Sequence, residues 1–68
     1  MPRLPCWTAA DAERELLAAG LAHLRSKGSY RIYGKGIIRV TVPFHSGGIL
    51  HPKIVKQVIE AIEEAGRN

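Results

Sequence analysis

Tyr30, His45 and Lys53 are the side chains of this sequence best suited to act on a phosphodiester. Tyr30 follows a Gly-Ser corner in KGSYRIY, and His45 follows the run VTVPF. A histidine, with an unperturbed pKa of about 6.5, exchanges protons near neutral pH, whereas a tyrosine, at about 10, stays protonated and is a poor base. Tyr30 can still donate a hydrogen bond to a phosphate or stack on a base. His45 can act as acid or base, although a lone loop histidine is more often structural or solvent-exposed.

The basic residues are concentrated in the middle of the chain. The net charge is +4, and all six acids lie in two clusters, within residues 11–15 and 60–64. Between Leu21 and Lys56 there is no acid, and the basic residues are Arg25, Lys27, Arg31, Lys35, Arg39, Lys53 and Lys56. Such a one-signed block is typical of a protein that binds a polyanion. The alternative is a solvated basic surface.

Other chemistries find little support. The single cysteine, Cys6, cannot form an internal disulfide, and the histidines and cysteine lack zinc-ligand spacing. Ser29 and Ser46 have no convincing triad partners, and Gly47-Gly48 is too short for a nucleotide-binding loop. We therefore expect no metal and no cofactor. The start of the chain lacks the apolar run of a signal peptide, and no segment approaches the roughly 20 apolar residues of a membrane span, so the sequence predicts a cytoplasmic protein.

Five elements are predicted to position these residues. Residues 8–11 form a capping-box-like start and Gly20 is a typical residue after a helix end, which together predict a helix over residues 9–19. Alternation of apolar and polar residues predicts strands at 21–26, 30–33 and 37–42. A second helix begins at Pro52, with His51 as its N-cap, and closes at Gly66. The fold class is α+β, with α-β-β-β-α order and two helices on one face of a three-stranded antiparallel sheet.

The hairpin between the second and third strands determines which side chains share a face. A three-residue loop, Gly34-Lys35-Gly36, places Arg31 opposite Arg39 and Tyr30 opposite Val40. Because like charges directly opposite are unfavourable, this arrangement indicates an anion over the sheet, with a solvated face or a protein interface as equal alternatives. The predicted outer face, opposite the helices, carries His23, Arg25, Arg31, Tyr33, Arg39 and Thr41.

A small cleft is predicted at the end of the sheet where the second strand begins. Tyr30 is expected to project with Ile32 toward the helices, and His45 and the start of the second helix come to the same end. A helix N-terminus offers N–H groups and a positive dipole end to a phosphate, and Lys53 adds charge there. Tyr30, His45 and Lys53 are therefore expected to line one cleft.

Nearly the whole chain resembles the HicA (YcfA-like) family of small toxins from prokaryotic toxin–antitoxin pairs. The matching segments are MPRLP, AAGL, KGSYRIY against a KGSH-type motif, and RVTVPFHSGGIL. The resemblance implies a single domain over residues 1–68 with a fold like the double-stranded RNA-binding domain. It also implies metal-independent cleavage of mRNA and neutralisation by a HicB-type antitoxin.

The resemblance also assigns roles to residues. The family's catalytic histidine follows the Gly-Ser corner, where this chain has Tyr30, and His45 matches the histidine of the V-P-x-H segment. The expected RNA-binding residues are Arg25, Lys27, Ser29, Arg31, Tyr33, Arg39 and Lys53. Two alternatives remain at this point: a non-catalytic RNA-binding module in which Tyr30 has replaced the base, and an interaction protein that docks an acidic partner such as an antitoxin. A chain this short has a thin stability margin, so a partner or self-association would stabilise it.

Overall fold

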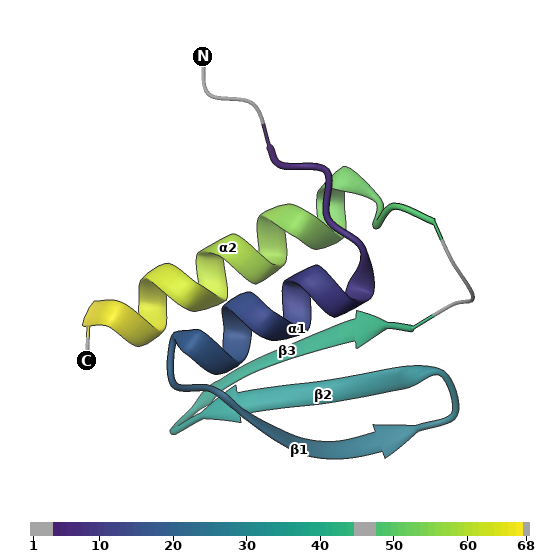
Figure 1. Ribbon diagram of the computed structural model, residues 1–68. Helices are drawn as coiled ribbons and strands as arrows, with labels where there is room; N and C mark the ends of the chain where they lie inside the picture. The colour runs from purple at the N-terminus through teal and green to yellow at the C-terminus, as the bar shows by residue number, and fades with distance from the viewer. Residues whose placement is uncertain (1–3, 45–47, 68) are drawn as a thin grey trace.

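The computed structural model describes residues 4–44 and 48–67. Its elements are α1 (Ala9–Ala18), β1 (Ala22–Lys27), β2 (Tyr30–Lys35), β3 (Ile38–Pro43) and α2 (Pro52–Arg67). The strands form one antiparallel sheet in the order β1-β2-β3, and both helices lie against the same face of it (Figure 1). The predicted α+β class and α-β-β-β-α order are confirmed.

Both helices begin where their capping residues predict. The Thr8 hydroxyl accepts a hydrogen bond from the Asp11 backbone N–H at 3.2 Å, and the Asp11 carboxylate accepts one from the Thr8 N–H at 3.0 Å. The Thr8 N–H bond is the main reason that the pKa of Asp11 is lowered. At α2, His51 Nδ1 accepts from the Lys53 backbone N–H at 3.0 Å, so His51 caps this helix. These bonds satisfy N–H groups that a helix leaves unpaired in its first turn.

The core lies between the sheet and the two helices. From β3, Ile38, Val40 and Val42 point inward, as their alternation predicts. The apolar stripe of α2 packs against them and contributes the buried residues Val55, Val58, Ala61 and Ala65. From α1, Ala12 and Leu16 complete the layer.

The predicted register between β2 and β3 is wrong. Lys35 pairs with Ile38, so the connection is a two-residue loop, Gly36-Ile37, in which Gly36 has a φ of 63°. Glycine takes a positive φ without the penalty of a Cβ, which suits the first position of a tight hairpin loop. Arg31 consequently lies opposite Val42 rather than Arg39, a slip of three residues. Because the slip is odd, every β2 side chain is on the face opposite to the predicted one.

This slip corrects four face assignments on β2. Tyr33 is completely buried among the core residues, and Arg31 points to the same helix-covered side. Tyr30 and Ile32, which were expected to face the helices, point to the outer face. Burying the large Tyr33 ring, with its hydroxyl hydrogen-bonded to Glu13, explains the preference for this register.

His23 on β1 is also on the helix-covered side, contrary to the prediction. It pairs with Tyr33, but Arg25 pairs with Ile32, so a bulge between His23 and Arg25 interrupts the alternation. A bulge puts an extra residue in one strand and redirects the side chains on either side of it. Arg25 therefore points to the outer face as predicted, and His23 does not.

Candidate nucleic-acid interface

The outer face of the sheet carries three basic side chains and one exposed aromatic ring. We define the outer-face patch by its residues: Arg25 and Lys27 on β1, Tyr30 on β2, and Arg39 on β3. Tyr30 is 48% exposed, and the three basic residues are exposed as well. Cations beside an accessible aromatic ring suit the phosphates and bases of a single-stranded nucleic acid.

Arg39 is held in place by the hairpin beside it. Its Nη1 donates to the backbone carbonyls of Gly36 at 2.6 Å and Ile38 at 2.8 Å. Its side chain lies over Gly34, where an added Cβ would come within 2.7 Å of both Arg39 and Leu24. The absence of a side chain at Gly34 therefore allows the Arg39 and Leu24 side chains to lie across the sheet.

The predicted cleft of Tyr30, His45 and Lys53 is not formed by the described residues. Tyr30 is on the outer face and pairs with Pro43, whereas Lys53 is in the first turn of α2 in the helix layer. A cavity of about 230 Å³ does occur near the start of α2, but its lining, among the described residues, is Ala9, Pro43, Gly48, Ile49, Leu50, His51 and Ile54. His45 lies outside the described residues. Ser29 sits in the β1–β2 turn, where its carbonyl accepts from the Phe44 N–H at 2.5 Å.

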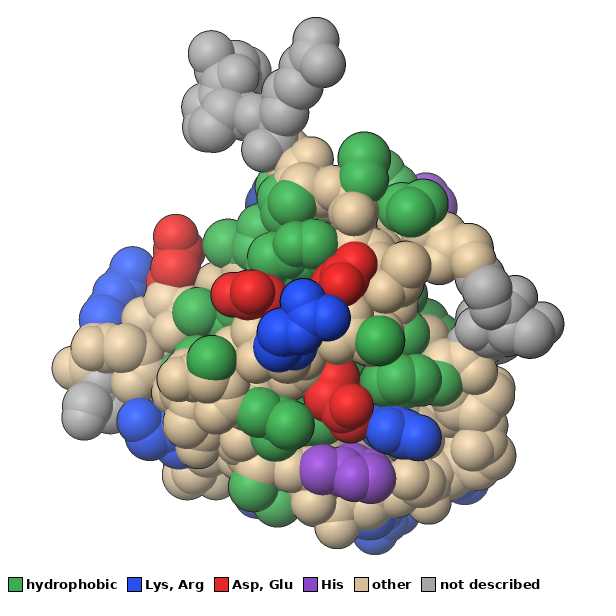
Figure 2. Space-filling view, in the orientation of Figure 1, with side chains coloured by type: hydrophobic (Ala, Val, Ile, Leu, Met, Phe, Trp, Pro, Cys, Tyr) green, Lys and Arg blue, Asp and Glu red, His purple; other side chains and the backbone are tan. Residues whose placement is uncertain are grey.

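A second polar cluster lies on the other face of the sheet, between α1 and the strands. We call it the Glu13 cluster, and it comprises Glu13 of α1, His23 and Ser26 of β1, and Arg31 and Tyr33 of β2. The Glu13 carboxylate oxygen Oε2 accepts from the Tyr33 hydroxyl at 2.5 Å and from Arg31 Nη1 at 3.0 Å. In Figure 2 acidic, basic and histidine side chains meet at the surface where α1 adjoins the sheet.

The remaining contacts of the Glu13 cluster fix its two outermost groups. The Arg31 guanidinium lies 4.2 Å from the centroid of the Phe44 ring, a cation–π distance. The His23 ring is 5.3 Å from the Tyr33 ring, tilted by 35°, and its Nε2 is 3.0 Å from the Ser26 hydroxyl. The cluster thus runs from a fully buried tyrosine to an exposed histidine.

The electrostatics of the Glu13 cluster favour a charged carboxylate and a neutral tyrosine. The pKa of Glu13 is lowered, first by the hydrogen bond from Tyr33 and then by Arg31. Burial, together with the nearby Glu13 charge, raises the pKa of Tyr33 to about 12. The hydrogen bond to Glu13 likewise raises the pKa of Arg31. Glu13 is therefore ionised and Tyr33 protonated throughout the neutral pH range.

The Glu13 cluster contains residues that the sequence did not single out. Glu13 was counted only as a member of an acidic cluster, and His23 was placed on the wrong face. One part of the cluster could have been predicted from the sequence. Arg31 and Tyr33 are two residues apart on a strand, so any register that buries Tyr33 places Arg31 on the same face beside it. The partner Glu13 is 20 positions away from Tyr33 and follows only from the packing of α1.

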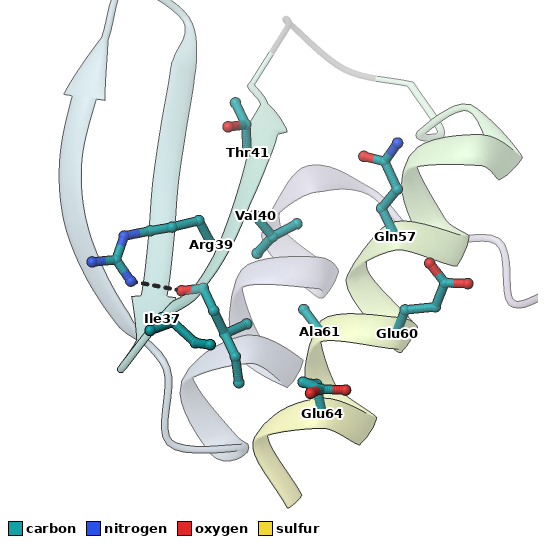
Figure 3. Close-up of a pocket in the computed structure, with 9 residues that line it drawn as sticks. Ile37, Arg39, Val40, Thr41, Gln57, Glu60, Ala61 and Glu64 are labelled. Atoms are coloured by element: carbon teal, nitrogen blue, oxygen red, sulfur yellow. Dashed lines mark hydrogen bonds between the residues drawn. The ribbon is translucent and has the colours of Figure 1, made fainter. Parts of the chain in front are cut away.

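The other edge of the sheet, where β3 adjoins α2, carries acidic rather than basic side chains on its helix wall. A groove of about 620 Å³ lies between β3 and α2 (Figure 3), lined by Ile37, Ile38, Arg39, Val40, Thr41, Gln57, Glu60, Ala61 and Glu64. The two strand residues nearest its base, Ile38 and Val40, are apolar and buried. Glu60 and Glu64 project from α2 along the other wall. Carboxylates along this groove repel a polyanion, so the groove does not suit a nucleic acid.

Among residues 4–44 and 48–67, no group of three or more His, Cys, Asp or Glu side chains is arranged to hold a metal ion. Neither α1 nor α2 has the length and hydrophobicity that crossing a lipid bilayer requires.

The sequence was compared with models of protein families and with curated proteins. A family model described as the HicA toxin of bacterial toxin–antitoxin matches residues 9–66, from the start of α1 almost to the end of α2. No curated protein sequence matches the chain.

Proposed function

Because the chain belongs to the HicA family of bacterial toxin–antitoxin toxins, we propose that it is an mRNA-cleaving ribonuclease. It acts in the cytoplasm on RNA bound to the outer-face patch, without a metal, and a HicB-like antitoxin neutralises it. The family itself accounts for the toxin role and for a cognate antitoxin. The RNA-binding surface, the metal-free chemistry and the identity of the antitoxin are the parts that we propose.

One structural observation carries the proposal: Arg25, Lys27 and Arg39 share the outer face with the half-exposed Tyr30 ring. Phosphates pair with the cations, and an unstacked base can lie against the aromatic ring. Glu60 and Glu64 of α2 lie along the far wall of the β3–α2 groove, across from the strand that carries Arg39. The charge distribution therefore supports binding of RNA on the outer face.

Cleavage of RNA without a metal uses the ribose 2′-hydroxyl as nucleophile, and a nearby group must take its proton. In the HicA family that group is the histidine that follows the Gly-Ser corner. This chain has Tyr30 at that position. A tyrosine has a pKa of about 10 and remains protonated at neutral pH. We assign Tyr30 to binding, as a stacking surface and hydrogen-bond donor, rather than to proton transfer.

A non-catalytic RNA-binding module is the second candidate, and the tyrosine at the position of the family histidine is the observation that favours it. The exposed Leu24 and Ile37 on or beside the outer face favour antitoxin docking at the same surface. An antitoxin docked on the outer face would block RNA binding by either a ribonuclease or a non-catalytic module. Antitoxin docking is therefore compatible with both candidate functions.

The test is degradation of an mRNA by the wild-type protein, Tyr30→His and His45→Ala, with RNA binding measured alongside. Wild-type cleavage without added metal supports the proposed function, and its loss in His45→Ala would assign the base to His45. Cleavage by Tyr30→His alone supports the non-catalytic module. The matched control is Arg67→Ala at the end of α2, which should bind and cleave like the wild type. RNA contacts through phosphates also predict that affinity falls steeply with salt.

A further inference from the structure

We propose that His23, Arg31 and Glu13 form the acid–base site at which RNA is cleaved, on the helix-covered side of β1. His23 is the general base, Arg31 binds the scissile phosphate, and Glu13 positions Arg31 and balances the charge formed on His23. This inference rests on the proposed function, because it needs RNA as the substrate. It supplies the proton acceptor that the chain lacks at Tyr30.

His23 has the geometry of a hydroxyl-activating base. Its Nε2 is 3.0 Å from the Ser26 hydroxyl, so this nitrogen already engages a hydroxyl group at hydrogen-bond distance. A ribose 2′-hydroxyl that displaced Ser26 would occupy an equivalent position. The ring packs 5.3 Å from the Tyr33 ring, which fixes one of its faces, and the residue itself is exposed to solvent.

Arg31 is prepared to bind a phosphate beside His23. Its Nη1 is occupied by Glu13, and its guanidinium plane lies 4.2 Å from the Phe44 ring centroid. These two contacts orient the planar group, and a guanidinium has five N–H donors in total. The side chain remains 40% exposed, which leaves donors accessible to a phosphate oxygen.

Glu13 connects the two groups. Its carboxylate is only 27% exposed and is ionised at neutral pH, with Tyr33 donating from the core side and Arg31 from the surface side. Glu13 and His23 both contact Tyr33, Glu13 through the tyrosine hydroxyl and His23 through the ring. A fixed negative charge stabilises an imidazolium as it forms, so Glu13 acts through His23 and Arg31 and is a positioning residue.

The proposed step is an internal transphosphorylation. Neutral His23 takes the proton of the ribose 2′-hydroxyl, and the 2′ oxygen forms a bond to the adjacent phosphorus. The bond from phosphorus to the 5′ oxygen of the next nucleotide breaks, and that oxygen leaves with a proton from solvent. The products are a 2′,3′-cyclic phosphate and a 5′-hydroxyl, and His23 returns its proton to solvent. Arg31 stabilises the extra negative charge on the phosphoryl oxygens as the new bond forms.

The position of β1 at the edge of the sheet allows one RNA strand to contact both the Glu13 cluster and the outer-face patch. β1 is an edge strand and all six of its residues are exposed. Arg25 and Lys27 on one face and His23 on the other are therefore reached from the same edge. An RNA strand that crosses this edge contacts the outer-face patch and the Glu13 cluster together.

The experiment measures cleavage of a labelled RNA oligonucleotide and, separately, binding of its uncleavable all-2′-deoxy analogue. His23→Gln should lower the cleavage rate about 10²–10⁴-fold, the usual effect of losing a general base, while binding changes less than about threefold. His51→Gln is the matched control, since His51 caps α2 and should leave the rate unchanged. The wild-type product should carry a 2′,3′-cyclic phosphate.

Glu13→Gln and Arg31→Lys test the supporting roles. His23 contacts Tyr33 of β2 and Ser26 on its own strand, and Tyr33 and Arg31 in turn donate to Glu13 of α1. Removing the Glu13 charge should lower the cleavage rate much more than it weakens binding of the deoxy analogue, because the imidazolium loses its counter-charge. A merely structural role for Glu13 would lower thermal stability without changing the cleavage rate of the folded protein. Arg31→Lys should lower the rate at least about tenfold because a lysine cannot reproduce the oriented planar contact.

Three results would overturn the inference, and they separate it from the proposed function. If the wild type binds and cleaves RNA and His23→Gln cleaves equally well, the site is elsewhere and the proposed function stands. If the wild type binds RNA but does not cleave it, both the acid–base site and the proposed ribonuclease activity are wrong, and the non-catalytic RNA-binding module stands. If the wild type neither binds nor cleaves RNA, RNA binding on the outer-face patch fails as well. Because His23 is exposed, its variant should fold, and circular dichroism with thermal unfolding verifies this.

Discussion

The two edge strands of the sheet, β1 and β3, differ in the charge that they offer to a ligand. Beside β1 lie Arg25 and Lys27 on the outer face, and His23 and Arg31 on the helix side. Beside β3 lies the groove with α2, where Glu60 and Glu64 form one wall. A net charge of +4 would suggest a uniformly basic domain, but Glu60 and Glu64 lie along the β3 edge. A polyanion is therefore attracted to the β1 edge, whereas at the β3 edge these two carboxylates oppose the attraction of Arg39.

The two sides of the sheet also differ in how they are joined to the helices. On the β3 side, Val40 and Val42 belong to the same buried cluster as Val55 and Val58 of α2. On the β1 side, α1 is joined to β2 by hydrogen bonds from Arg31 and Tyr33 to Glu13. Hydrophobic contacts are insensitive to protonation, whereas hydrogen bonds to a carboxylate depend on its charge. The β1 side is therefore the pH-dependent part of the fold and also the side that we assign to RNA.

The largest expected effect is on stability, from the buried tyrosine of the β1 side. Tyr33→Ala should cost about 3–5 kcal/mol, as truncation of a buried aromatic ring does. A domain of this size has a total stability of only about 3–10 kcal/mol, so this loss is a large fraction of it and the variant should unfold at a much lower urea concentration. Tyr30→Ala on the outer face should cost less than about 1 kcal/mol, since exposed substitutions have small effects. Urea unfolding followed by circular dichroism gives both values, and equal losses would contradict the observed register.

The second effect concerns RNA affinity at the β1 edge. Replacing Arg25 and Lys27 by glutamate should weaken binding about 10–100-fold and reduce the salt dependence by about 1.4 in the log–log slope, from two lost phosphate contacts on a single strand. Fluorescence anisotropy with a labelled single-stranded RNA at several salt concentrations measures both. The charge-matched control replaces Arg14 and Arg67, which are exposed on the helices, by glutamate. An equal loss in that control would show that net charge, rather than the β1 edge, determines affinity.

The third effect is the pH dependence of the polar junction between α1 and β2. Glu13→Gln should lower the stability at pH 7 by about 1–2 kcal/mol, the range for hydrogen bonds to a charged group that is partly exposed. Because the folded pKa of Glu13 is lowered, its contribution is present above the unfolded value of about 4.3 and is lost as the pH falls through the folded value. Urea unfolding at pH 7, 5 and 3 should therefore show a smaller acid-induced loss in Glu13→Gln than in the wild type. Parallel curves would mean that Glu13 does not titrate with folding.

Much of the fold could be predicted from local patterns. The capping box at Thr8 and the cap at His51 place both helix starts, and the alternation along β3 gives its inward residues. These features depend on residues a few positions apart, which a sequence displays directly. On the outer face, Arg25 and Arg39 are where the sequence predicts them for the same reason.

The features that could not be predicted depend on contacts between distant residues. The glycines around Lys35 are compatible with either a three-residue or a two-residue hairpin loop, so the turn alone does not fix the register. The observed choice leaves Ile37 almost fully exposed at the loop and buries Tyr33 against Glu13, a contact across 20 positions. The bulge beside His23 likewise has no glycine or proline to mark it in the sequence. These two irregularities moved Arg31, Tyr33 and His23 into the Glu13 cluster.

The smallest expected effect is the change in RNA affinity when the acidic residues at the β3 edge are replaced. Replacing Glu60 and Glu64 by lysine removes the acidic wall of the groove and adds four charges in total, a change as large as that of the β1 double variant. If RNA binds at the β1 edge, affinity should rise less than about threefold at 0.15 M salt, because β3 is about 10 Å from β1 across the sheet and the Debye length is about 8 Å. The charge-matched control replaces Glu15 and Glu63, exposed residues outside the groove lining, and should show a similar rise. An increase of tenfold or more that is specific to Glu60 and Glu64 would mean that RNA passes over the groove, and the assignment of opposite roles to the two edges would then be wrong.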